Sequence, residues 1–151
     1  MNKFIYTILL AFLFFSCSTK KNKPLNKGYH SIVSSYNVLF NGAVSIEEGL
    51  LQTQNAFNEN FWEVLPIEKI KISDEIITVD GIDNANFIKG EEKAAKTIQK
   101  HSMIINGTQE NSKIANAYLL LGKARYLDQR FVPALDAFNQ VYKHMAINDE
   151  L

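Results

Sequence analysis

The chain has 151 residues, with sixteen basic and sixteen acidic side chains, so its formal net charge is zero. This length predicts a single domain. A neutral chain lacks the basic footprint of nucleic-acid-binding proteins. A single cysteine, Cys17, excludes a framework of internal disulfides.

The first segment has the pattern of an export signal. Lys3 gives a positive start, and residues 4–15 form an uncharged, mostly apolar run. A helix that spans a bilayer needs about 20 apolar residues, so this run is too short to span and fits the core of a signal peptide. Ser16 and Cys17 follow it. A small residue before a lone cysteine at this place resembles the lipobox of bacterial lipoproteins, in which the thiol is acylated.

The lipobox resemblance implies that residues 1–16 are a lipoprotein signal peptide and that acylated Cys17 anchors the chain to a membrane. A plain secretory signal with an incidental cysteine is the alternative. Residues 17–28 are polar, with four lysines, and are expected to form a flexible tether. Some bacterial lipoproteins carry an acidic run here as a surface-export signal, so the basic tether implies a periplasm-facing protein.

Residues 29–60 predict an N-terminal helical hairpin. Apolar residues from Tyr29 to Phe40 recur at intervals of three and four, which indicates one face of an amphipathic helix. Gly42 is expected to end this helix, because glycine tolerates the left-handed conformation after a helix. Ser45 is expected to cap the second helix.

Residues 61–86 are expected to form an extended or irregular connection. Pro66 disfavours helix in the residue before it. Alternating isoleucines further on suggest two short strands, with an ordered loop as the alternative. Phe61, Trp62 and Leu65 are expected to be buried against the helices; exposed, they would form a site for a partner.

The clearest pattern lies in residues 115–145, where two apolar stripes flank the polar turn Asp128-Gln129-Arg130. Two antiparallel helices are expected there. The tetratricopeptide repeat has the pattern W-x2-L-G-x2-Y, then A-x3-F, then P, over 34 residues. The positions that agree with it in register are Tyr118, Leu121, Gly122, Ala134 and Phe138.

Small residues allow the two helices of such a repeat to approach, so Gly122 is expected to lie opposite Ala134. Arg125 departs from the pattern at its third aromatic position, and Ala146 stands where the closing proline is usual. An ordinary amphipathic hairpin of a helical bundle is the alternative interpretation.

We therefore expect an all-α fold of antiparallel helical hairpins, with tetratricopeptide-like helices over residues 87–151. A helix around Ala94 looks like the second helix of a preceding repeat. Repeat arrays generally need about three units, so the last helix would leave Phe138 and Tyr142 partly uncovered. Either the chain dimerises there, or it is the front of a longer protein.

Several strings together are similar to one family, the tetratricopeptide lipoproteins of the type IX secretion and gliding-motility machinery (PorW/SprE-like). They follow the lipobox and extend over nearly the whole chain. The strings are Tyr36-Asn37-x-Leu39-Phe40-Asn41-Gly42, Asn60-x-Trp62-Glu63-x-Leu65-Pro66-Ile67-Glu68, Glu91-Glu92-Lys93-Ala94 with Ile98-Gln99-Lys100-His101, Ala117 to Tyr126, and Asp128-Gln129-Arg130-Phe131-x-Pro133-Ala134-Leu135.

This resemblance implies a non-enzymatic scaffold that is lipid-anchored to the outer membrane, faces the periplasm and contacts other protein subunits of the secretion and gliding machinery. It carries no catalytic residue over to this chain. Family members are several times longer, so the chain resembles their N-terminal part. A nutrient-binding lipoprotein of an uptake system, for glycans or peptides, is the alternative.

The sequence contains no phosphate loop, dinucleotide fingerprint, HExxH helix or nucleophile elbow. His30, His101 and His144 are scattered at intervals that define no metal site. We therefore expect no enzyme, no metal, no cofactor and no small-molecule substrate.

Overall fold

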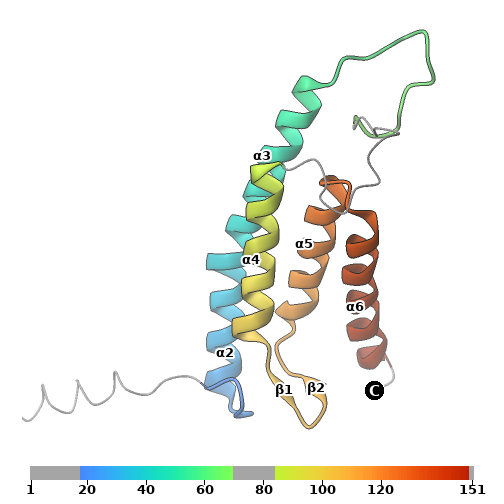
Figure 1. The fold of residues 1–151 in the computed structure, drawn as a ribbon. Coiled ribbons are helices and arrows are strands. Elements are labelled where there is room, and N and C mark those ends of the chain that lie inside the picture. Colours follow the sequence, from blue (N-terminus) through green and yellow to red (C-terminus); the bar gives the residue numbers. More distant parts are fainter. Residues whose placement is uncertain (1–17, 70–83, 150–151) are drawn as a thin grey trace, which may run out of the picture.

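The computed structural model describes residues 18–69 and 84–149, which are mostly helical (Figure 1). This agrees with the predicted all-α class. The predicted signal peptide, Cys17 and the predicted strands within residues 70–83 lie outside the described residues. The helices are α2 (Pro24–Val33), the π-helical segment η1 (Ser34–Leu39), α3 (Phe40–Ala56), α4 (Ala85–His101), α5 (Lys113–Leu127) and α6 (Phe131–Asp149).

The first helix runs without interruption through α2, η1 and α3, so the predicted hairpin of residues 29–60 is wrong. Gly42 lies inside the helix and does not end it. A Cβ atom on Gly42 would lie 2.9 Å from the Leu120 side chain and 3.1 Å from Lys93 Cβ, so this glycine allows close packing of helices. Ser45 does not cap a helix, because its hydroxyl donates to the Asn41 carbonyl of the same helix at 3.0 Å.

The predicted tether of residues 17–28 is also corrected, because its last residues are helical. Pro24 begins α2, at a position where its fixed φ suits a helix and its missing N–H costs nothing. The buried Asn26 side chain donates to the carbonyl of Ser18 at 2.9 Å and to that of Lys21 at 3.2 Å. These bonds hold the preceding residues against the start of the helix.

The helices α3, α4, α5 and α6 pack side by side in chain order, each antiparallel to the one before (Figure 1). Glycines let the first two approach closely: a Cβ on Gly49 would lie 2.6 Å from the Phe87 ring, and one on Gly90 would lie 2.5 Å from Ile46. Ala94, Leu121 and Ala137 form a small core farther along the stack. Each helix therefore contacts mainly its neighbours in the sequence.

Two short connections join the later helices. Between α4 and α5, strands β1 (Ile104–Ile105) and β2 (Thr108–Gln109) pair antiparallel. Asn106 and Gly107 turn between them with φ of 53° and 84°, the left-handed values that a tight hairpin requires. Between α5 and α6, the chain turns at residues 128–130, as predicted.

Candidate interaction surface

The residues predicted to form the repeat lie on the two helices α5 and α6. Leu121, Gly122 and Ala134 are buried, and Tyr118 and Phe138 are half-buried. The predicted pairing of Gly122 with Ala134 is corrected. A Cβ on Gly122 would meet the Phe138 ring first, with the nearest ring carbon 2.4 Å away. Gly122 therefore makes room for the ring, one helical turn beyond Ala134.

Arg125, the departure from the repeat pattern, is part of an ion-pair cluster that joins the last three helices. Its Nε donates to Glu91 Oε1 on α4 at 2.8 Å, and its Nη1 donates to the Pro133 carbonyl on α6 at 3.1 Å. Arg130 also donates to Glu91, and its Nε donates to Asp128 Oδ2 at 2.8 Å. An aromatic ring at position 125 could not replace the two bonds that Arg125 makes.

The two arginines set the ionisation of Glu91. Partial burial opposes the charged form, but the hydrogen bonds and charges of Arg130 and Arg125 outweigh it and lower the pKa of the Glu91 carboxyl below its usual 4.5. The carboxylate thus remains charged and paired near neutral pH. Its role is to hold helices together.

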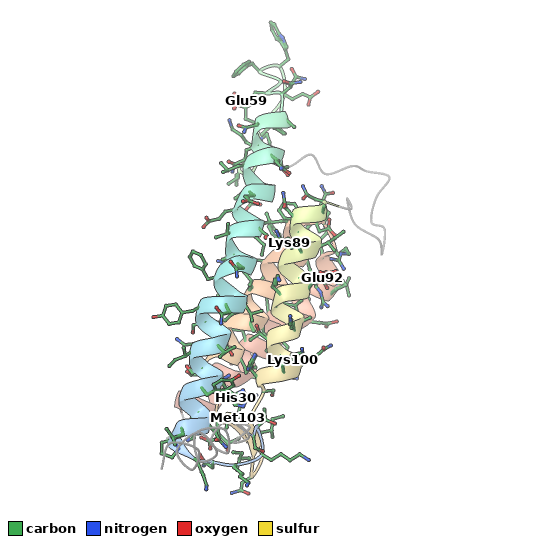
Figure 2. The ribbon with its side chains drawn as sticks, turned by 90° about the vertical axis from the view of Figure 1, so that its left-hand side faces the viewer. His30, Glu59, Lys89, Glu92, Lys100 and Met103 are labelled. Carbon is green, nitrogen blue, oxygen red and sulfur yellow. The ribbon has the colours of Figure 1, made fainter. Side chains whose placement is uncertain are left out.

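His30 and His101, which the sequence suggested were scattered, lie together in the core. Their Nδ1 atoms are 2.9 Å apart, which joins α2 to α4. Burial, followed by the charges of His30 and Lys100, lowers the pKa of His101 below 6.5. Figure 2 shows His30 and Met103 at the same end of the bundle. Nothing in the sequence signalled a contact between residues so far apart.

The most exposed apolar residues lie in residues 57–69, which follow α3 and are called here the apolar loop. Phe61 is 76% exposed and Trp62 is 97% exposed, and the remaining apolar residues after them are Val64, Leu65 and Ile67. The predicted burial of Phe61, Trp62 and Leu65 is therefore wrong. The loop extends past the end of α3, and none of the described helices covers it there (Figure 1).

Polar contacts hold the apolar loop in its shape. The Trp62 N–H donates to Asn60 Oδ1, and the Glu63 N–H donates to the Asn60 carbonyl, each at 3.2 Å. Lys69 pairs with Glu59 at 2.7 Å across the base of the loop. The exposed apolar side chains therefore lie on a backbone that forms a hydrogen-bonded turn at residues 60–63.

A side-chain hydrogen bond joins the end of the apolar loop to α5. Tyr126 Oη on α5 donates to Glu68 Oε2 at 2.9 Å. This bond, followed by burial, raises the pKa of the Tyr126 hydroxyl above 10.0. The hydrogen bond thereby holds the end of the loop against α5, the helix that contains the L-G part of the repeat pattern.

Two open hollows of about 450 Å³ and 500 Å³ lie along the apolar loop. The first is lined in part by Phe57, Leu65 and Pro66. The second lies between the loop and the helices and includes Ile67 and Leu127. Exposed aromatic side chains beside such hollows are typical of surfaces that bind other proteins.

The residues whose side chains the structure describes, 18–69 and 84–143, contain no group of three or more His, Cys, Asp or Glu side chains placed to hold a metal ion. Over the same ranges, none of the helices combines the length and the apolar character needed to cross a membrane. No protein-family model matches the chain, and no curated protein matches it.

Proposed function

We propose that the chain is a non-enzymatic, lipid-anchored scaffold of a bacterial type IX secretion and gliding-motility apparatus. The observation that carries this proposal is the exposure of Phe61 and Trp62 in the apolar loop. The same stretch, Asn60 to Glu68, contains one of the strings that resemble the tetratricopeptide lipoproteins of that machinery. One of the strings behind the resemblance thus lies on a surface that is available to a partner.

The parts of the chain have separate roles in this proposal. Acylated Cys17 holds the protein on the periplasmic side of the outer membrane. The antiparallel helices support the loop as tetratricopeptide-type hairpins would, although one continuous helix stands in place of the first predicted hairpin. Trp and other aromatic side chains contribute much of the binding free energy at protein interfaces. The loop therefore serves as the docking element for another subunit.

The form of the apolar loop favours a protein partner over a small nutrient. Sites for small ligands are concave and enclose most of the ligand surface. Trp62 and Ile67 instead extend almost fully into solvent. A protein surface with its own pocket would cover such side chains best.

Co-purification from solubilised envelopes tests this function. The tagged chain is expected to recover subunits of the secretion machinery. Trp62→Ala should reduce that recovery at least about tenfold, because a tryptophan hot spot contributes about 2 kcal/mol or more. Tyr142→Ala, a change of an exposed aromatic on α6, is the matched control and should leave recovery unchanged.

Two results would contradict the proposal. One is recovery of a glycan or peptide transporter in place of secretion subunits. The other is equal recovery by the Trp62 variant and the parent chain.

A further inference from the structure

The long first helix exposes many of its large apolar residues, unlike an ordinary surface helix. Its buried face carries the apolar Val38, Leu39 and Ile46 together with small and polar residues: Asn26, His30, Ser34, Gly42, Ser45 and Gly49. Its exposed face carries what we call the outer stripe: Leu25, Tyr29, Ile32, Tyr36, Phe40, Val44 and Leu51. Figure 2 shows ring side chains projecting from the edge of this helix that faces away from α4.

The polar residues are inside because they have specific partners there. His30 contacts His101, and Ser34 Oγ accepts a hydrogen bond from Asn111 Nδ2 at 3.4 Å. Gly42 and Gly49 let other helices approach. The internal packing therefore accounts for the inner face. Of the outer stripe, Tyr29 makes an edge contact with the His30 ring, whose centroid lies 5.2 Å away, and the other stripe residues of the described chain are left largely exposed. Tyr36 is 74% exposed and Phe40 is 63% exposed, a large apolar area to leave in water.

The outer stripe has the spacing of a helix that pairs with another helix. Leu25, Tyr29, Ile32 and Tyr36 follow one another at steps of four, three and four, which is a heptad pattern. The next step, to Phe40, is one residue too long.

The π-helical segment compensates for that extra residue. The Phe40 N–H bonds to the Ser35 carbonyl, five residues earlier, so one turn holds an additional residue. Beyond it the heptad continues through Val44 and Leu51, with Glu47 at the intervening position. The π-helical turn thus keeps the stripe on one side of the helix.

The outer stripe is self-complementary when two copies run antiparallel and are centred at the level of Val38, whose own side chain is buried on the inner face. Positions equally distant from that centre then face one another. Leu25 faces Leu51, Ile32 faces Val44, and Tyr36 faces Phe40. In the fourth pair, Tyr29 faces Glu47, so a phenol hydroxyl meets the only carboxylate in the pattern.

The charges select the same orientation. Lys20, Lys21 and Lys23 lie just before the helix, and Lys27 in its first turns is already paired with Glu110 of the same chain. Acidic residues lie near the other end, at Glu47 and Glu48. Residues 28–46 contain no Lys, Arg, Asp or Glu. Antiparallel pairing brings the basic end of one helix to the acidic end of the other, whereas parallel pairing would place Glu47 against Glu47.

We propose that the outer stripe binds the outer stripe of a second copy of this chain, antiparallel and centred near Val38. The contact would extend about 40 Å, from Leu25 to Leu51 at 1.5 Å per residue. It leaves the apolar loop free, and it does not depend on the proposed role in secretion.

Cysteine cross-linking of the full chain in membranes tests the pairing and its direction. Two tagged copies are produced together, one with Leu25→Cys and the other with Leu51→Cys. Oxidation should link them to each other. Copies that both carry Leu25→Cys, or both Leu51→Cys, should not be linked, because antiparallel pairing holds those positions about 40 Å apart. The chain with Cys17 alone measures the background.

The mass in mild detergent gives a second readout. The full chain should behave as a dimer. Tyr36→Glu combined with Phe40→Glu should weaken the dimer at least about 100-fold, since each charge would be buried in the contact. Trp62→Glu, in the apolar loop, is the control that should stay dimeric. Circular dichroism verifies that each variant keeps its helix content.

Three results would overturn the inference. Links between identical positions would indicate parallel pairing. A monomeric parent chain without cross-links would indicate another occupant of the stripe, such as residues 70–83 of the same chain or a lipid surface. A dimer unaffected by the Tyr36 and Phe40 changes would place the contact elsewhere.

Discussion

Glu91 is a single residue that helps to hold the last three helices together. Its carboxylate receives hydrogen bonds from Arg125 on α5 and from Arg130 in the turn before α6. The sequence pattern showed only that Arg125 departs from the aromatic residue expected there. The reason could not be predicted, because Glu91 lies 34 residues away and only the fold brings the two together.

Replacement of Glu91 tests this cluster. Glu91→Gln should lower the free energy of unfolding by about 1–3 kcal/mol at neutral pH, because two charge-assisted hydrogen bonds are weakened. Chemical denaturation measures the change. Glu92→Gln, at an exposed neighbouring position, is the control and should change stability by less than about 0.5 kcal/mol.

The pH dependence of the same variants follows from the direction of the pKa shift. The pKa of Glu91 is lowered in the folded state, so its contribution to stability is present above 4.5 and is lost as the pH falls through the lowered value. Glu91→Gln should remove this part of the acid destabilisation. Identical acid unfolding of the two glutamine variants would show that Glu91 has no special role.

The periodicity of apolar residues predicted well which segments are helical. It predicted poorly which face of the first helix is buried. The turn at residues 128–130 follows from polar residues between two apolar stripes. In the first helix, Tyr29, Tyr36 and Phe40 define a real stripe, but it faces outward because the opposite face forms the specific contacts. Gly42 was expected to end a helix, because the sequence alone does not distinguish a glycine that ends a helix from one that allows two helices to pack closely.

The packing of α5 against α6 is tested at its closest point. Gly122→Leu should lower the free energy of unfolding by about 1–3 kcal/mol, because the added side chain overlaps the Phe138 ring. In a Phe138→Ala background much of this cost should disappear, whereas an Ala134→Gly background should not relieve it. Thermal or denaturant unfolding of the single and double variants measures the coupling.

Gly28→Leu supplies the control for that series. Gly28 lies in α2, and a Cβ there would meet nothing within 4 Å. Its replacement should be neutral or should stabilise the helix by up to about 1 kcal/mol. A cost equal to that of Gly122→Leu would mean that helix geometry, and not contact with Phe138, explains the effect.

The whole molecule offers separate surfaces for separate contacts. The apolar loop follows the end of α3 at one end of the stack (Figure 1). The outer stripe lies along the exposed side of the first helix. Tyr142, 74% exposed on α6, belongs to neither surface. The helical class of the chain could be predicted from the sequence, but the exposure of Phe61 and Trp62 could not, because it depends on where α3 ends.

We propose above that the apolar loop binds a protein of the secretion machinery. A photoreactive amino acid placed at position 62 in living cells tests this proposal most directly. Illumination should link the chain to one other envelope protein of that machinery, whereas the same residue at position 92 on α4 should link to none. Links from position 62 to a nutrient transporter, to lipid alone or to nothing would contradict the account.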